Sequence, residues 1–258
     1  MSPPNLPTRD LPVLKATSHI FSGVKAHWRP MLNLALPWIA LITLLNIIAV
    51  RVYPSPPSST PQFNLNWIDV VIFFLNLLAT ASVAVSWHQF ILRDAPLNAV
   101  KPFRMDKNVR LYFVRIILID GICFIPFVAL AVALGIIPPV FWPVVLALLI
   151  QLAVFAYRIS LSLPAIAIGN LAIGLKQSIE ITRGNNLRIL GLLALVYLIL
   201  VVVLLAFAVA VNILQLISPT LGFISVFIFG IPVVFFNMLL AASLLTSLYG
   251  FFIEKREF

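Results

Sequence analysis

Six long apolar stretches, separated by short polar or proline-containing segments, constrain this chain more than any other feature. A helix needs about 20 mostly apolar residues to cross the hydrocarbon core of a bilayer, and each stretch has about that many or more. Hydrophobic residues make up 62% of the chain and charged residues only 10%, whereas soluble domains carry about 25% charged residues. We therefore expect an all-α, polytopic membrane protein with transmembrane helices over residues 31–50, 67–91, 111–135, 139–162, 187–216 and 221–252.

Prolines divide the longest apolar runs into separate helices. The segment from Gly135 to Pro139 interrupts one such run, because proline lacks a helix donor and disfavours helix in the residue before it. Ser218 and Pro219 separate the last two stretches in the same way. We expect three helical hairpins within one domain over residues 31–258, preceded by a cytoplasmic amphipathic segment over residues 1–30.

Lysine and arginine are distributed very unevenly among the connections. In the order of the expected helices, 16 of the 17 basic residues fall on one side of the membrane, and only Arg51 falls on the other. Basic residues are enriched on the cytoplasmic side of membrane proteins, so both termini are expected in the cytoplasm. This placement also accounts for the net charge of +9, and nucleic acid is therefore not an expected partner.

Two cytoplasmic segments, residues 13–29 and 165–184, are expected to form amphipathic helices in the membrane interface. In each segment apolar residues share one helical face and charged residues the other. In the first segment Lys15, Lys25 and Arg29 lie opposite Val13, Ile20, Phe21, Val24 and Trp28. In the second, Lys176, Glu180 and Arg183, spaced for ion pairs along the helix, lie opposite Ile168, Leu171, Ala172, Leu175 and Ile179. Such faces either attract anionic lipid or serve as topological anchors that lead into the next span, and the second role is favoured.

Ionisable and amide side chains within the apolar stretches are candidate functional residues, because such groups are costly in a bilayer. Asp120 and Gln151 lie at about the same depth in neighbouring antiparallel spans, and we expect Asp120 to face the interior and contact Gln151 or another polar group. A second polar level is formed by Asn46, Asn76 and Asn237. These residues either line a solute path or serve as hydrogen bonds between helices, and the second role is favoured.

Recognisable catalytic, metal-binding and cofactor-binding motifs are missing from the sequence. Trp87, near the cytoplasmic end of the second span, is interpreted as an interfacial anchor, with His88 alone beside it. Arg115 and Arg158 match each other in depth near the cytoplasm. An intramembrane lipid-modifying enzyme would have to be built from these four residues, and we expect a protein without enzymatic activity, metal or cofactor.

Two short motifs resemble a group of uncharacterised bacterial six-helix membrane proteins. One is Trp87-His88-Gln-Phe90-Ile-Leu92, and the other runs from Arg158 to Ala165 and on to Asn185. The group is related to the membrane domain fused to some glycerophosphodiester phosphodiesterases. The resemblance implies a bacterial cytoplasmic (inner) membrane protein; the catalytic barrel of the fused enzymes is absent, so their activity and metal site are not carried over.

These observations favour a scaffold or accessory subunit whose basic cytoplasmic surface contacts anionic lipids or membrane partner proteins. The alternative is a small-solute transporter or channel that uses the polar layer around Asp120. Substitution of Asp120 by asparagine separates the two hypotheses, because a scaffold keeps its partners whereas a proton- or ion-coupled carrier loses activity.

Overall fold

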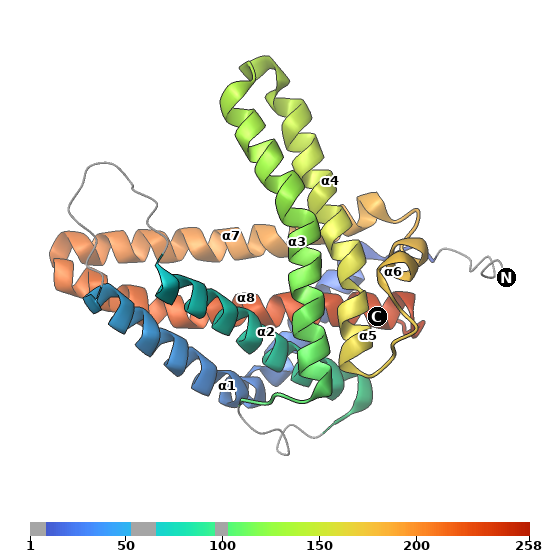
Figure 1. Ribbon diagram of the computed structural model, residues 1–258, viewed down its shortest axis with the longest axis horizontal. Coiled ribbons are helices and arrows are strands. Elements are labelled where there is room, and N and C mark those ends of the chain that lie inside the picture. Colours follow the sequence, from blue (N-terminus) through green and yellow to red (C-terminus); the bar gives the residue numbers. More distant parts are fainter. Residues whose placement is uncertain (1–8, 53–65, 96–102) are drawn as a thin grey trace.

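The computed structural model describes residues 9–52, 66–95 and 103–258, and these residues contain helices and no strand (Figure 1). Six stretches of the described chain are helical, long and apolar enough to cross a membrane, so the prediction of an all-helical protein with six such helices is confirmed. The long helices are α1 (Val13–Val52), α2 (Trp67–Arg93), α3 (Lys107–Ile136), α4 (Trp142–Ser160), α7 (Asn186–Ile217) and α8 (Pro219–Phe252). Three short helices accompany them: η2 (Pro139–Phe141), α5 (Ser162–Ala167) and α6 (Leu175–Ile181).

The breaks expected at prolines are present. Helix α3 ends at Ile136, and Pro139 begins the short helix η2 that leads into α4. Ser218 alone separates α7 from α8, which has Pro219 as its first residue. Proline is tolerated at this position because the first N–H groups of a helix have no partner within it. The prolines in the local sequence therefore determine where these helices begin and end.

The N-terminal amphipathic segment is not a helix separate from the first expected span. Helix α1 runs without interruption from Val13 to Val52 and contains both Pro30 and Pro37. Ala16, Ile20 and Val24, spaced four residues apart, are buried. Helices α7 and α8 pack against α1, so much of the apolar face expected to lie in lipid is covered by protein.

The single helix expected over residues 165–184 is also wrong. Helix α5 ends at Ala167, and Gly169 adopts a positive φ of 79° that favours glycine. The N–H of Asn170 then donates to the carbonyl of Ala165, 2.8 Å away, which completes a helix-terminating turn. Leu171, expected on the apolar face, lies in the following loop and is 63% exposed, and α6 starts only at Leu175.

We call residues 79–93 of α2, all of α5 and residues 239–252 of α8 the base of the molecule. Every residue of 81–88, and all but one of 239–252, is buried. The start of α3 packs on this region, as do α1 and α7. In Figure 1 the long helices converge here, and the C-terminus lies beside it.

We call residues 120–150, the distal parts of α3 and α4, the arm. Figure 1 shows it projecting from the base in a different direction from α7 and α8. Within residues 120–150 only Val145 is buried. Large apolar side chains such as Phe124, Ile125 and Val140 are between 64% and 75% exposed. The arm thus presents apolar surface on most sides.

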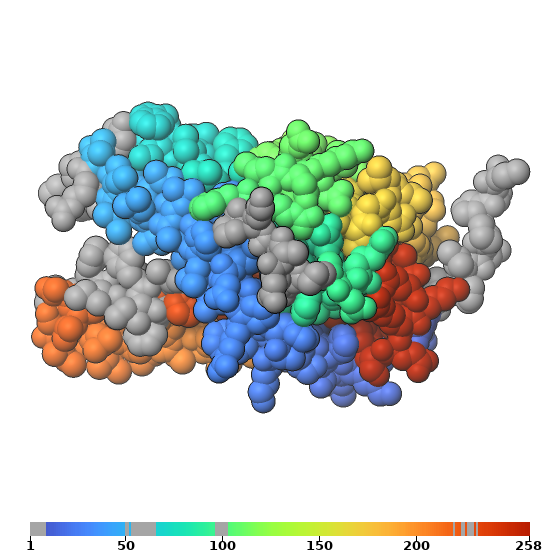
Figure 2. All heavy atoms as spheres, turned by 90° about the horizontal axis from the view of Figure 1, so that it is seen from below, coloured from blue at the N-terminus to red at the C-terminus, as the bar shows by residue number. Residues whose placement is uncertain are grey.

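Helix α1 lies between α2 and the C-terminal helices and packs against both. It packs against α2 and against α8, and Figure 2 shows its blue spheres between the teal α2 and the orange-to-red C-terminal helices. Met31, Ala35 and Trp38 of α1 join one apolar cluster with α2, α3 and α8, while Ala16 and Ile20 join a second cluster with α7 and α8.

Candidate functional site

The main buried polar cluster joins α2, α3 and α8 through His88. Its Nδ1 lies 2.7 Å from Oγ1 of Thr246, and its Nε2 lies 3.1 Å from the hydroxyl of Tyr112. Thr246 donates its own proton to the carbonyl of Ala242, 2.7 Å away, so it accepts from Nδ1–H. The neutral imidazole consequently accepts at Nε2 from the Tyr112 hydroxyl.

This cluster is closed to solvent. The exposed fraction is 0% for His88, 2% for Tyr112 and 3% for Thr246. Each ring nitrogen of His88 is already engaged, so a role as general base would require a hydrogen bond to break first. The arrangement is that of a cross-link between three helices.

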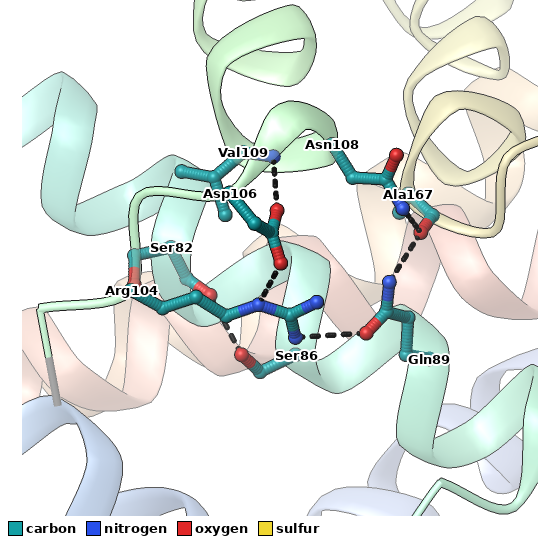
Figure 3. Close-up of polar contacts among 8 residues, drawn as sticks. All are labelled: Ser82, Ser86, Gln89, Arg104, Asp106, Asn108, Val109 and Ala167. Atoms are coloured by element: carbon teal, nitrogen blue, oxygen red, sulfur yellow. Dashed lines mark hydrogen bonds and ion pairs between the residues drawn. The ribbon is translucent and has the colours of Figure 1, made fainter. Parts of the chain in front are cut away.

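A second network surrounds Gln89, one residue further along α2 (Figure 3). Its Nε2 donates to the carbonyl of Ala167 at the end of α5, 2.7 Å away, and its Oε1 accepts from Arg104 at 2.8 Å. Asn108 donates to the same carbonyl at 3.1 Å. Helix α2, the start of α3 and the end of α5 are thereby joined.

Asp106 connects this network to the first turn of α3. One carboxylate oxygen accepts from the N–H of Val109 at 3.0 Å, which satisfies a free donor of the helix N-terminus. The other oxygen is paired with the guanidinium of Arg104 (Figure 3). A carboxylate at this position also complements the positive end of the helix dipole.

Arginine side chains close the helix ends at the base. Arg256 donates to the carbonyls of Ile91 and Leu92, the last turn of α2, at 3.3 and 3.1 Å. Arg93 donates to the carbonyl of Ile168 at 3.0 Å. Asn185 similarly ties the N-terminal segment to α7, because its Oδ1 accepts from the N–H of Leu11 at 3.0 Å. Arg256 and Arg93 thus donate to carbonyl groups at helix ends, which have no partner within the helix.

The predicted interface residues are dispersed. Trp87 is 1% exposed, so its interpretation as an interfacial anchor is wrong; α1, α3, α5 and α8 cover this part of α2. Arg158 donates to Oγ1 of Thr182 at 2.8 Å and to the carbonyl of Ile179 at 2.6 Å, at the end of α6. Arg115 is half-buried. In the described part of the chain neither arginine contacts His88, so the four residues of the enzyme hypothesis do not form one site.

Two charged residues of α6 behave as expected. Lys176 and Glu180 form an ion pair of 4.0 Å along the helix, with side-chain exposures of 85% and 48%. An exposed pair of this kind contributes little stability. Arg183 is exposed in the turn after α6. All three lie on the surface next to the base.

The predicted intramembrane polar layer does not gather inside the protein. Asp120 and Gln151 are both exposed on the arm, so the expectation that Asp120 faces the interior is wrong. Nothing in the described residues joins Asp120 to Gln151 by a hydrogen bond. Helix α3 is apolar around its whole circumference there, so the sequence pattern did not indicate which side would face its neighbours.

The three asparagines are exposed as well, on α1, α2 and α8. Asn46 donates to the carbonyl of Ile42 at 2.8 Å, and Asn76 donates to that of Ile72 at 2.9 Å. Each bond lies within one helix, four residues back. Asn237 has an exposed side chain near the middle of α8. The expected hydrogen bonds between helices are therefore not formed by this set.

Sequence reasoning missed Tyr112, Thr246, Gln89 and Arg104 because each is an ordinary residue in its local context. One available signal was the run of small residues around Ser82 and Ser86 on α2, since small residues mark close helix packing in membranes. Within the described residues no group of three or more His, Cys, Asp or Glu side chains is arranged to hold a metal ion.

The chain matches no family model, no curated protein and no solved structure. The resemblance stated from the two short motifs therefore stays a prediction. What the fold defines is a helical protein with six helices able to cross a membrane.

Proposed function

We propose that this protein is a non-enzymatic scaffold or accessory subunit of the bacterial cytoplasmic membrane, built from three helical hairpins with both termini in the cytoplasm. In this orientation the base lies at the cytoplasmic side and the arm extends through the bilayer. Partner membrane proteins bind along the arm, and basic residues around the base contact anionic lipid.

The observation that carries this proposal is the contrast between a closed base and an open arm. Polar side chains of the base such as His88, Gln89 and Arg93 are engaged with other side chains or with helix ends. The arm, by contrast, leaves all residues of 120–150 except Val145 at least partly exposed. In lipid, helices associate through van der Waals packing and polar contacts, and the arm offers both kinds of surface.

Asp120 fits the role of a partner contact. Its carboxyl lies on the exposed surface of the arm instead of in a cavity. A carboxyl group in lipid is costly unless it is neutralised or finds a hydrogen-bond partner. A polar residue on a partner helix at the same depth would supply that contact. The transporter hypothesis loses support, because its candidate residues point away from a common interior.

The test is gentle detergent extraction of the tagged protein from its native membrane, followed by mass spectrometry of co-purifying proteins. We expect a partner at a fixed ratio. Ile125→Trp on the arm should reduce that ratio at least severalfold, because Ile125 is 75% exposed. Leu205→Trp on α7, where the native side chain is 61% exposed, is the matched control and should leave the ratio unchanged.

A protein that purifies alone would contradict the proposal, as would equal loss of the partner in both tryptophan variants. Asp120→Asn separates the alternative. A scaffold keeps its partner through the remaining packing and the amide, whereas a proton- or ion-coupled carrier loses uptake in a vesicle transport assay while its assembly is unchanged.

A further inference from the structure

Helices α1 and α8 leave an apolar trough between them, with a volume of about 690 Å³. Volumes of about 300–1,000 Å³ are typical of sites for small ligands. One wall contains Trp28, Leu32 and Leu36 from α1, and the other contains Pro232 and Phe236 from α8. Among the described residues that line it, only Lys25 carries a charge. On α1 the lining runs from Phe21 to Leu36, so the trough is apolar along its length with one cation, Lys25, about a turn from its Phe21 end.

From Lys25 onward, the trough is about as long as one leaflet of a bilayer is thick. Lys25 and Leu36 are eleven residues apart on one continuous helix, which corresponds to about 16 Å at helical rise. The hydrocarbon core of a bilayer is about 30 Å thick, so the acyl region of one leaflet is about 15 Å. In the proposed orientation Lys25 lies at the cytoplasmic headgroup level and Leu36 lies near the middle of the bilayer.

Two cations lie near the Phe21 end of the trough: Lys25, which lines it, and Arg29, which lies one turn further along α1. Within the described residues neither Lys25 nor Arg29 forms an ion pair, although acidic residues elsewhere are paired, as in Asp10 with Arg188. The guanidinium carbon of Arg29 lies 5.5 Å from the ring centroid of Trp28. Trp28 is 42% exposed, and tryptophan is enriched at the headgroup level of membranes. This end of the trough is suited to an anion.

We propose that this trough binds one anionic phospholipid, with an acyl chain between α1 and α8 and the phosphate at Lys25 and Arg29. The proposal rests on the cytoplasmic orientation of the base in the proposed function. It goes beyond a diffuse attraction of basic residues to anionic membranes, because it assigns one lipid to one place. A lipid fits better than a polar ligand because the lining beyond Lys25 and Trp28 has no hydrogen-bonding side chain.

Native mass spectrometry of the intact protein tests this assignment. The protein is reconstituted with equal amounts of phosphatidylglycerol and phosphatidylcholine, extracted in mild detergent, and the retained lipid is counted. We expect one phosphatidylglycerol per chain. Lys25→Gln should weaken its retention about fivefold, the effect of one basic residue near a membrane surface. Leu36→Trp should reduce retention further by filling the trough.

Matched controls lie on the same helix. Lys15→Gln removes an exposed charge ten residues before Lys25, and Leu44→Trp enlarges a side chain that is 54% exposed outside the trough. Both controls should retain the lipid. Equal loss in test and control variants, equal retention of the two lipids, or no retained lipid would each overturn the proposal.

The lipid result and the proposed function fail independently. A chain that retains its lipid but co-purifies with no protein partner loses the scaffold role and keeps the lipid site. A chain that keeps its partner but shows no difference between Lys25→Gln and Lys15→Gln keeps the scaffold role and loses the site. Size-exclusion elution of each variant checks that its fold is intact.

Discussion

The base and the arm belong to the same chain but follow opposite rules of composition. The base is rich in small and polar residues such as Ser82, Ser86, Ser243 and Thr246, and it is almost entirely buried. The arm consists mainly of large apolar residues and is almost entirely exposed. In water the arm would be the buried part. In lipid, small residues let helices approach closely and polar groups must find partners inside the protein, so the polar part forms the core.

The largest difference in stability between base and arm is expected when the His88 cross-link of the base is removed. His88→Ala deletes two interhelical hydrogen bonds and opens a cavity at a fully buried position. We expect the free energy of unfolding, measured by SDS titration in mixed micelles, to fall by about 2–4 kcal/mol.

The control for His88→Ala is Phe124→Ala on the arm, where the native ring is 64% exposed. Its effect should stay within about 0.5 kcal/mol, as for most surface substitutions. Similar losses in the two variants would show that the arm packs as tightly as the base.

A medium effect is expected from enlarging a small residue. Ala81, in the base, has an exposed fraction of 0%, and Ala81→Leu would force neighbouring helices apart at a cost of about 1–3 kcal/mol. The same change on the arm, Ala129→Leu, places the added atoms on an exposed surface. Thermal unfolding in detergent should show a lower midpoint for the first variant only; equal midpoints would contradict close packing around Ala81.

The smallest effect is expected from a pair of glutamines. Gln89→Ala removes hydrogen bonds to Ala167 and Arg104 and should cost about 1–2 kcal/mol of unfolding free energy. Gln151→Ala on the arm removes an exposed amide and should leave that energy nearly unchanged. A larger loss at Gln151 than at Gln89 would mean that the arm amide makes the more important contact, and would reverse the comparison.

The helices themselves could be predicted because their signals are local. A run of apolar residues, a proline or a basic cluster is visible without knowledge of the fold, and the breaks near Pro139 and Pro219 were found in this way. The continuity of α1 was missed because the apolar face of residues 13–29 has the same composition whether it packs on lipid or on protein. Pro30 lies within α1 and does not end it.

The site could not be predicted because its partners are distant in the sequence. His88 bonds to Tyr112, 24 residues away, and to Thr246, 158 residues away. For Asp120, the direction of the side chain could not be predicted either. Its position along α3 follows from helical rise, but the direction in which it points depends on how α3 is rotated against its neighbours. No periodic pattern on this uniformly apolar helix records that rotation.

The contacts of α8 also impose an order on the making of the protein. During synthesis α2 is complete long before α8 leaves the ribosome, yet the bond of His88 to Thr246 and the closure of the end of α2 by Arg256 both require the later segment. The first helices must therefore wait in the membrane with polar groups uncovered. Insertion of α8 and the segment after it is the step that completes them.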